Sequence, residues 1–582
     1  MMKKYISMIV FGLMMASCMD TVILPDDKTV DEDFWKSKSD VQLMVNGAYQ
    51  GMLSSDVIKR LIVWGSLRSD ELVPVASVSG ASAQSVLEDL VEINTGNTQY
   101  DNMFATWGAV YTVINRCNLV LDRAKSVVGA YGGNDPSYTE GDYLADCSQM
   151  LALRALCYFY LVRNFRDVPY YTEAYMNSSQ PLDIAQTAPE TVLLACIADL
   201  EEAEKNAISP LAYTDWRRVG YFNTEGIDAL LADIYLWLGS VKHDNAYYEK
   251  AVEYCDKVIA SKQQAHALRD RSASATEDEY PLAEGKDMFD ELFNTMNAEE
   301  SIFELQFDGS TNSNVGVCEM LNRYSSSAAN SYLHAPTIFV KGGNVYNTAG
   351  DDWRAVLNTY KSDGGSDVVV RKMVYSGQTP NSMTASSDQE KAPSTLRAYA
   401  KYRQNYIIYR LTDVMLMKAE ALMALATGDD DETHLHAAFD LIRAVNLRAK
   451  SNASDALTWS TSYGQSQIEA LVLAERLREL AFEGKRWYDL LRYNYRHAED
   501  GTVYYSLTMA EQNERGIAFA STLKEMLALM ARKLGAQGDA VSAKLGTEPT
   551  LYMPVPKADL EVSPQLRQNP AYSVGTEYEK NY

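Results

Sequence analysis

The sequence predicts a mostly α-helical fold, in which paired helices form a scaffold that carries long loop-rich inserts and a few short strands. Through much of the 582-residue chain, apolar residues recur at the spacing of three and four that marks one face of a helix. Two pairs of these segments repeat one pattern of apolar and small residues, and long polar stretches without helical periodicity separate the two pairs. Together these features predict a helical repeat scaffold with elaborated loops.

Ten segments have the helical pattern. Proline stands at residue 189, in the first turn of its segment, where the missing N–H costs little, and Pro169 follows the end of an earlier helix. The predicted helices are 40–53, 102–127, 146–165, 189–206, 224–238, 246–261, 411–426, 433–450, 467–495 and 521–534.

The two pairs match the spacing of tetratricopeptide helical hairpins. In that repeat a small residue on each helix allows the two helices to approach closely. The matching positions are Tyr235, Leu238, Gly239, Ala251, Cys255 and Val258 in the first pair, and Leu422, Leu425, Ala426, Ala438, Ile442 and Val445 in the second. Because an array of hairpins needs about three repeats to bury a continuous core, the earlier helices are expected to form looser units.

Residues 262–410 form a loop-rich insert between these pairs. They contain one short predicted strand at 301–307 and long polar stretches around it, and residues 64–100 form a shorter insert of the same kind. Loops of this length inside a compact protein are usually functional or disordered. The inserts are therefore the first place to look for a site.

The N-terminus has the features of an export signal. Lys3 and Lys4 precede an apolar stretch at 6–16, which is too short to span a bilayer and ends in Met-Ala-Ser-Cys at Cys18. Small residues directly before a cysteine indicate a bacterial lipoprotein cleavage site, so Cys18 is predicted to carry the lipid, with an ordinary signal peptide as the alternative. Residues 1–17 are then the signal peptide and 18–36 an acidic tether.

Charge and cysteine content narrow the class of protein. The formal net charge is −25, from 53 basic and 78 acidic side chains, and removal of Lys3 and Lys4 lowers it to −27. Such a surface repels polyanions, which argues against nucleic-acid binding. Six cysteines besides Cys18 have no C-x-x-C spacing and five lie in helical patterns, so buried free thiols are expected, with a disulfide as the alternative.

Several motifs resemble those of the SusD/RagB family of lipid-anchored nutrient-binding proteins from Bacteroidetes outer membranes. The strongest is 478–490, Arg-Glu-Leu-Ala-Phe-Glu-Gly-Lys-Arg-Trp-Tyr-Asp-Leu, and a second is 409–422, where Thr412 replaces the usual alanine. The others are Trp107-x-x-x-Tyr111-x-x-Ile114-Asn115-x-x-Asn118, the segment 153–169, Asp352-x-Arg354 and the closing segment 552–572. The resemblance covers nearly the whole chain.

The resemblance implies a function. It implies an outer-membrane lipoprotein, facing the cell exterior, that captures oligosaccharide and hands it to a SusC-like TonB-dependent transporter. It also implies an N-terminal SusD-like helical region at 37–261 and a C-terminal RagB/SusD region at 262–582. Oligopeptide capture, a polysaccharide-degrading enzyme on a helical scaffold and a ligand-free tetratricopeptide interaction protein are the alternatives.

Most motif residues have a structural interpretation. Asn115 and Asn118 lie three apart on one helix face and are expected to bind irregular backbone. Glu483, Lys485 and Arg486 lie among Phe482 and Trp487, so we expect buried ion pairs at a helix junction.

No residue pattern indicates catalysis or a cofactor. The chain lacks the G-x-S-x-G, H-E-x-x-H, Walker A and dinucleotide-binding patterns. His434 and His436 are two apart on a helix and so face different ways, and the acidic run 429–432 is expected to cap a helix instead of binding Ca²⁺. We therefore expect neither a metal nor an enzyme.

Aromatic residues in the inserts are the candidate ligand-binding residues. A sugar presents an apolar C–H face with a rim of hydroxyls, which suits an aromatic ring bordered by polar side chains. Both kinds of residue alternate through the inserts, although any one ring can instead be a core residue that anchors its loop. The candidates are Tyr324, Tyr332, Tyr346, Trp353, Trp64 and Tyr100.

Overall fold

The computed structural model describes residues 34–572 with gaps at 76–80, 93–101, 177–179, 181–182, 270–279, 322–331, 341, 347–350, 362–367, 378–393, 397–401, 499–502 and 535–537. The predictions for Cys18, the signal peptide and most of the tether therefore lie outside the described residues.

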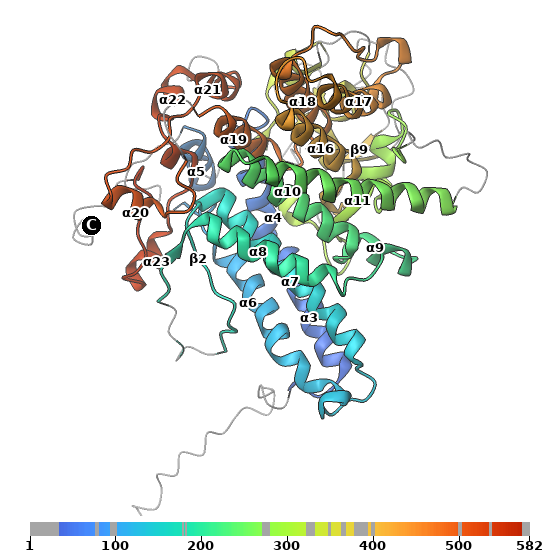
Figure 1. Ribbon diagram of the computed structural model, residues 1–582, viewed down its shortest axis with the longest axis vertical. Coiled ribbons are helices and arrows are strands. Elements are labelled where there is room, and N and C mark those ends of the chain that lie inside the picture. Colours follow the sequence, from blue (N-terminus) through green and yellow to red (C-terminus); the bar gives the residue numbers. More distant parts are fainter. Residues whose placement is uncertain are drawn as a thin grey trace, which may run out of the picture.

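Helices dominate the N-terminal half, as predicted (Figure 1). The helix predicted at 146–165 begins earlier, at Glu140, because Thr139 and Asp142 form a capping box that satisfies its first N–H groups. The helices are α3 (Lys38–Met52), α4 (Ser55–Ile62), α5 (Ala81–Val91), α6 (Gly108–Arg123), α7 (Glu140–Phe165), α8 (Pro189–Glu204), α9 (Arg217–Gly220), α10 (Thr224–Lys242) and α11 (Asn245–Arg269).

The C-terminal half adds shorter helices around three longer ones, α16, α17 and α18, whose bounds follow. Its helices are α12 (Val315–Leu321), α13 (Arg354–Leu357), α14 (Arg371–Val374), α16 (Leu411–Leu425), α17 (Glu432–Ala449), α18 (Gln465–Glu479), α19 (Arg486–Arg496), α20 (Met509–Glu514), α21 (Lys524–Ala531), α22 (Gly538–Lys544) and α23 (Lys557–Val562). The extended segment after α22 contacts α7 in the N-terminal half, since the N–H of Met553 donates to the carbonyl of Asn164 over 2.8 Å.

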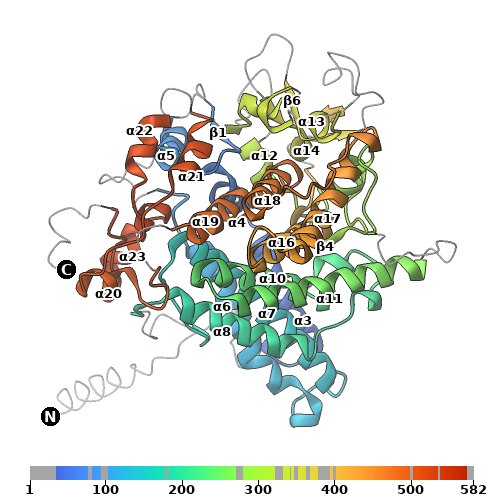
Figure 2. The same cartoon turned by 45° about the horizontal axis from the view of Figure 1, so that its top comes forward.

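The two predicted hairpins form and stack on each other. α10 packs against α11, α16 packs against α17, and α11 also lies along α16 (Figures 1 and 2). A methyl group on Gly239 would lie 2.8 Å from the ring of Tyr248, so glycine is what permits the close crossing of α10 and α11. The prediction of a tetratricopeptide-like scaffold is confirmed.

The described strands are short and pair only in twos. The strand predicted at 301–307 is β4 (Ser301–Leu305), which is buried and pairs antiparallel with β10 (Tyr406–Arg410) just before α16. The other pairs are β1 (Val73–Pro74) with β5 (Leu333–His334), β2 (Val168–Pro169) with β3 (Gln186–Thr187), β6 (Thr359–Lys361) with β7 (Val368–Val370), and β8 (Tyr375–Gly377) with β9 (Ser394–Leu396).

The helix predicted at 467–495 is wrong in one respect, because the chain forms two helices there. α18 ends at Glu479 and α19 starts at Arg486, and between them Phe482 and Gly484 adopt φ of 66° and 72°. These left-handed conformations turn the chain and cannot belong to an α-helix. The helical spacing of apolar residues continues through the turn, and so the sequence predicts one helix where there are two.

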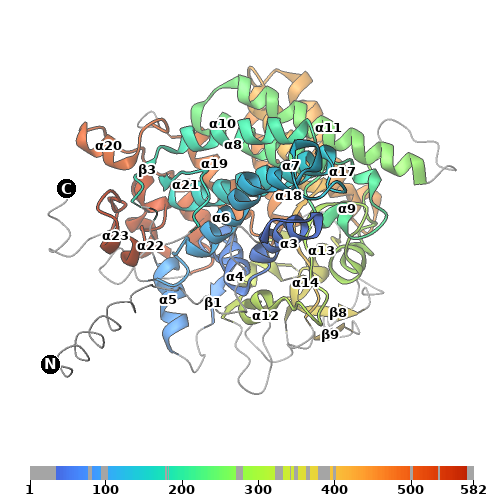
Figure 3. The same ribbon diagram turned by 90° about the horizontal axis from the view of Figure 1, so that it is seen from below.

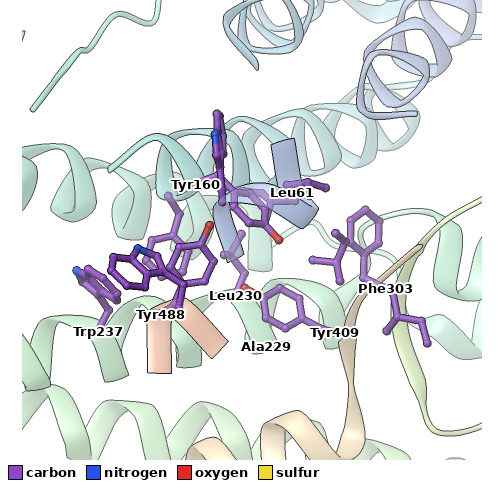
Figure 4. Close-up of a cluster of buried hydrophobic side chains, with 14 of the residues drawn as sticks. Leu61, Tyr160, Ala229, Leu230, Trp237, Phe303, Tyr409 and Tyr488 are labelled. Atoms are coloured by element: carbon purple, nitrogen blue, oxygen red, sulfur yellow. The ribbon is translucent and has the colours of Figure 1, made fainter. Parts of the chain in front are cut away.

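Tyrosine fills much of the core between the helices and β10. Figure 4 shows Tyr160, Tyr409 and Tyr488 with Leu230 in one buried cluster. The Tyr409 hydroxyl donates to Asp233 over 2.9 Å, and the Tyr488 hydroxyl accepts from Asn164 over 2.9 Å, so these two rings are buried while their polar ends stay hydrogen-bonded. Much of the high tyrosine content, 38 Tyr against 14 Phe, therefore serves packing.

Candidate functional site

The two predicted inserts meet at a short sheet. β1, from the first insert, pairs antiparallel with β5, from the second, so that Val73 lies opposite His334. The N–H of Val75 extends the pairing by donating to the carbonyl of Tyr332 over 2.9 Å. We call this region, residues 73–75 with 332–335, the insert junction. It joins two loop regions that are far apart in the sequence into one surface.

The insert junction rests on a fixed base. α12 lies beside β1 in Figures 2 and 3 and packs against α4, where a methyl group on Gly316 would come within 2.7 Å of Ile58. Lys59 of α4 forms an ion pair with Glu319 of α12. A surface held in this way can bind a ligand without first paying the entropy of ordering a loop.

Tyr332 is the predicted site residue that lies at the insert junction. Its N–H donates to the carbonyl of Glu319 over 3.3 Å, and its own carbonyl accepts from Val75. Its ring packs against the core on one side and is half-buried. A ring that is fixed by its backbone and partly open to solvent can stack on the apolar face of a ligand.

Trp353 also keeps part of its ring exposed. Its N–H donates to the carbonyl of Ala449 over 2.9 Å, and its indole contacts Gly285 closely enough that a methyl group there would lie 3.1 Å away. These contacts place Trp353 against the C-terminal end of α17. It remains a candidate, positioned by different elements from Tyr332.

The predictions for Trp64 and Tyr346 are wrong, because both are core residues. Trp64 is fully buried, and its indole N–H donates to the carbonyl of Phe104 over 2.7 Å. The Tyr346 ring is buried against Phe339, and its hydroxyl accepts from the side-chain amide of Asn358 over 2.7 Å. Neither ring has a face free for a ligand. Tyr324 and Tyr100 lie outside the described residues.

The D-x-R motif enters a buried network of charges. Arg354 binds Asp352 through Nε and Nη2, at 2.9 and 2.8 Å, and its Nη1 reaches Glu475 and Glu479, at 2.6 and 3.0 Å. Arg410 binds Glu479 from the other side, at 2.6 Å. These buried groups tie the start of α13 and the end of β10 to α18.

Glu483 completes this network and confirms the predicted ion pairs. It accepts from Arg410 Nε over 2.9 Å and from Lys372 over 2.7 Å. Arg486 binds Asp70 over 2.8 Å. All of these side chains are buried, and each contact unites segments that are distant in sequence.

A second set of ion pairs holds α16 against α18 and α19. Asp413 binds Lys485 and Arg476, each at 2.9 Å. Burial alone would raise the pKa of Asp413, but these two cations outweigh it and lower the pKa to about 2. The carboxylate thus stays ionised and paired, which suits a structural role and not proton donation.

Two further predictions about polar motif residues are confirmed. Asn115 exchanges hydrogen bonds with the backbone of Tyr175, at 3.0 and 2.7 Å, and Asn118 donates to the carbonyl of Glu173 over 3.1 Å. Asp431 caps α17 by accepting from the N–H of His434. These side chains satisfy irregular backbone and a helix end.

Across the described parts of the chain, no three His, Cys, Asp or Glu side chains are grouped as metal ligands would be. No helix in those parts combines the length and apolar character needed to cross a membrane. Cys117, Cys147, Cys157, Cys196 and Cys255 are free thiols, and all of them except Cys147 are buried.

Sequence reasoning missed one exposed aromatic residue, Trp216. It precedes α9, in the connection 205–223 between α8 and α10, and 45% of its surface is exposed. The inserts drew attention because they are longer still, whereas this connection contains no motif. Only the exposed side chain itself could have identified it.

The chain resembles proteins of one family along most of its length. Residues 329–572 match the model of the SusD family. The SusD-like protein P2 of Formosa agariphila is 26% identical over 507 residues, which cover 84% of this chain and 91% of that protein.

Solved structures share the fold. A SusD homolog from Bacteroides thetaiotaomicron superimposes with a TM-score of 0.65 at 19% identity, over 93% of this chain and 99% of that one. A laminarin-binding SusD-like protein superimposes with a TM-score of 0.58 at 20% identity, over 92% of this chain and all of the other. The likeness thus extends to the scaffold and its inserts together.

Proposed function

Since this chain belongs to the SusD/RagB family, we propose that it is a cell-surface lipoprotein that binds oligosaccharide and delivers it to a SusC-like TonB-dependent transporter in the outer membrane. In this proposal no bond is made or broken, and the protein presents the ligand at the insert junction. Cys18 carries the lipid that holds the chain on the membrane.

The observation that carries the proposal is the pairing of β1 with β5. It gathers the two aromatic-bearing inserts on one surface, with the half-buried ring of Tyr332 at their meeting point. An aromatic face suits the C–H face of a pyranose, and the amides and carboxylates of the inserts suit its hydroxyls. One protein of the same fold is described as laminarin-binding, which makes a β-glucan the first ligand to test.

The carboxylates of the motif at 478–490 do not suit a hydrolase. Glu479 and Glu483 are buried, and burial raises the pKa of each carboxyl group, but nearby cations outweigh it and lower the pKa. These cations are arginines around Glu479 and Arg410 with Lys372 around Glu483. A glycosidase needs one carboxyl group that keeps a proton near neutral pH beside the substrate. These two groups instead serve the scaffold, which favours capture over turnover.

Calorimetry of the purified protein with laminarin, starch, levan, xylan and a set of oligopeptides tests the proposal. We expect saturable binding of a glycan, with Tyr332→Ala lowering the affinity at least about tenfold, the effect of roughly 1.4 kcal/mol of lost stacking. Tyr346→Phe is the matched control, because it alters a buried tyrosine outside the insert junction. Binding of peptides alone would favour the oligopeptide alternative and contradict the proposal.

Two further measurements separate the remaining alternatives. Release of reducing sugar in the same samples would indicate an enzyme. Cys18→Ser should move the protein out of the membrane fraction, because a lipid anchor supplies about 0.8 kcal/mol for each buried CH₂ group. Co-purification of a large outer-membrane barrel with the wild-type protein tests the transporter pairing.

A further inference from the structure

Trp216 forms an aromatic surface outside the insert junction. It lies at the start of α9, which Figure 3 shows well apart from β1. With 45% of its surface exposed, it is the most exposed tryptophan among the described residues. Exposing so large an apolar ring is unfavourable in water, and so its position calls for an explanation.

The ring is held firmly from below. The indole packs directly on α9, since a methyl group on Gly220 would lie 2.7 Å from its six-membered ring. Its edge contacts Tyr221 with ring centroids 5.3 Å apart, and Tyr221 in turn stacks on Tyr49 at 4.9 Å. Tyr49 is buried and reaches Phe303 of β4. A continuous row of rings therefore fixes the exposed indole to the core.

Two charged residues flank Trp216 in the chain, and their side chains bind each other. Arg217 binds Asp215 through Nε and Nη2, at 3.0 and 2.8 Å, and its guanidinium lies over the ring of Tyr213, 5.3 Å from the centroid. The Tyr221 hydroxyl donates to the side chain of Asn46 over 2.5 Å. Hydrogen-bonding side chains therefore stand next to the indole in the sequence, and their existing contacts reduce the rotamer entropy that they lose on binding.

This arrangement matches the surface of a sugar better than that of a protein. A hexose needs one flat ring and a border of hydrogen-bonding groups, which Trp216, Asp215 and Arg217 supply. A protein interface instead needs a contiguous apolar core with its charges at the edge. Here the residues on both sides of the tryptophan in the chain are charged and exposed.

We propose that Trp216, with Asp215 and Arg217, forms a second carbohydrate-binding site, in which the indole stacks on one sugar unit of the same glycan class that the insert junction binds. The inference rests on the proposed function for its class of ligand. Two sites on one protein hold different parts of a long polysaccharide, and the second contact is then intramolecular. Trp216 therefore contributes most to the capture of long chains.

Calorimetry with laminarin and the other three polysaccharides tests the second site. The long ligand is the polysaccharide that the wild-type protein binds, and the short ligand is the six-unit oligosaccharide of the same glycan. We expect Trp216→Ala to lower the affinity for the long chain at least about tenfold, because linking two sites can raise affinity by about a hundredfold or more. We also expect it to remove one of two binding sites for the short ligand. Trp216→Tyr should retain most of both, since a flat ring remains.

Leu211→Ala is the matched control, because Leu211 is exposed to the same degree, 46%, in the short helical turn packed near α9, but offers no flat face. If Leu211→Ala weakens binding as much as Trp216→Ala, the region is a general apolar docking patch and the proposal is overturned. Unchanged affinity and stoichiometry in Trp216→Ala would overturn it too, while leaving the proposed function intact.

Titration of the wild-type protein and of Tyr332→Ala distinguishes failure of the proposed function from failure of the second site alone. If it binds none of the four polysaccharides, the proposed function itself is contradicted and the second site with it. If Tyr332→Ala abolishes glycan binding entirely, so that Trp216 alone holds nothing, the second site is also contradicted. Thermal unfolding of each variant checks that the fold is intact, which is expected because the exposed Trp216 and Leu211 side chains fill no cavity.

Discussion

Two regions of the molecule differ in whether sequence motifs mark them. One is the charged interior, the buried ion pairs around Asp413, Glu479 and Glu483 between α16, α18 and α19, and the other is the insert junction. The interior contains the long motifs at 409–422 and 478–490, and nearly every charged residue in them is buried and paired. The insert junction contains no motif, and its one described candidate ring is Tyr332. The comparison teaches that the recognisable motifs of this chain specify a scaffold, whereas the residues that we propose to bind ligand belong to no motif.

The motif at 478–490 also specifies a close crossing of two backbones. Gly65, in the π-helical turn after α4, faces Gly484 so closely that a side chain on either residue would meet the other backbone or a neighbouring side chain. Gly484 adopts a φ of 72°, which favours glycine. The family pattern at this point therefore encodes a helix break and a crossing, not chemistry.

The largest effect should follow from breaking the charged interior. Glu479→Ala removes the carboxylate that Arg354, Arg410 and Arg448 share, which leaves these three cations under-compensated. We expect a loss of about 3 to 5 kcal/mol in the free energy of unfolding, measured by urea denaturation. Lys205→Ala, at an exposed ion pair with Glu202, is the control and should change it by less than about 0.5 kcal/mol. Equal effects in both variants would contradict the structural role of the interior.

A smaller loss is expected at the backbone crossing. Gly65→Ala places a methyl group against the carbonyl of Gly484, so the chains must move apart, and we expect a loss of about 2 to 3 kcal/mol. Gly47→Ala, in the middle of α3 with open space around it, should instead stabilise the protein by about 0.5 to 1 kcal/mol. Thermal unfolding distinguishes the two, and a stabilising Gly65→Ala would show that the crossing is not tight.

The pH dependence of stability should identify Asp413 as part of the same interior. Its pKa is about 2 in the folded protein and about 3.8 when unfolded, so the unfolded chain takes up its proton first as pH falls. The stabilisation, about 2 kcal/mol, is complete above pH ~4 and disappears as pH falls through ~2. Asp413→Asn should therefore be less stable than wild type at pH 7, with the difference shrinking below pH 4. A constant difference across that range would contradict this assignment.

The smallest effect should occur at the residue that sequence reasoning misplaced. Tyr346→Phe removes a buried hydroxyl that accepts from Asn358, and we expect a loss of about 1 kcal/mol in the free energy of unfolding. Glycan affinity should not change, because the ring lies in the core. A clear loss of affinity without a loss of stability would return Tyr346 to the ligand surface.

The sequence predicted the scaffold well because helices follow local periodicity. The hairpins at α10 and α11 and at α16 and α17, the buried pairs around Glu483 and the cap at Asp431 all depend on spacing that is visible in the chain. The break between α18 and α19 was missed, because a positive φ at Phe482 has no apolar signature.

Individual ligand-binding rings were not predictable to the same degree. Trp64 and Tyr332 both lie in or beside loop-rich segments, yet one fills the core and the other lies partly in solvent. Burial of a ring depends on which distant segments pack on it, such as Phe165 edge-on to Trp64, and one sequence does not reveal these contacts. Trp216 was not predicted because nothing in the connection 205–223 indicates that its ring is exposed instead of packed in the core.

Calorimetric titration of the wild-type protein and Tyr332→Ala with laminarin and the other polysaccharides tests the central claim, that the insert junction binds glycan. We predict saturable binding to the wild type and at least about tenfold weaker binding to Tyr332→Ala, with unchanged thermal unfolding. Equal glycan affinity in the two proteins, or binding of oligopeptides only, would contradict the account.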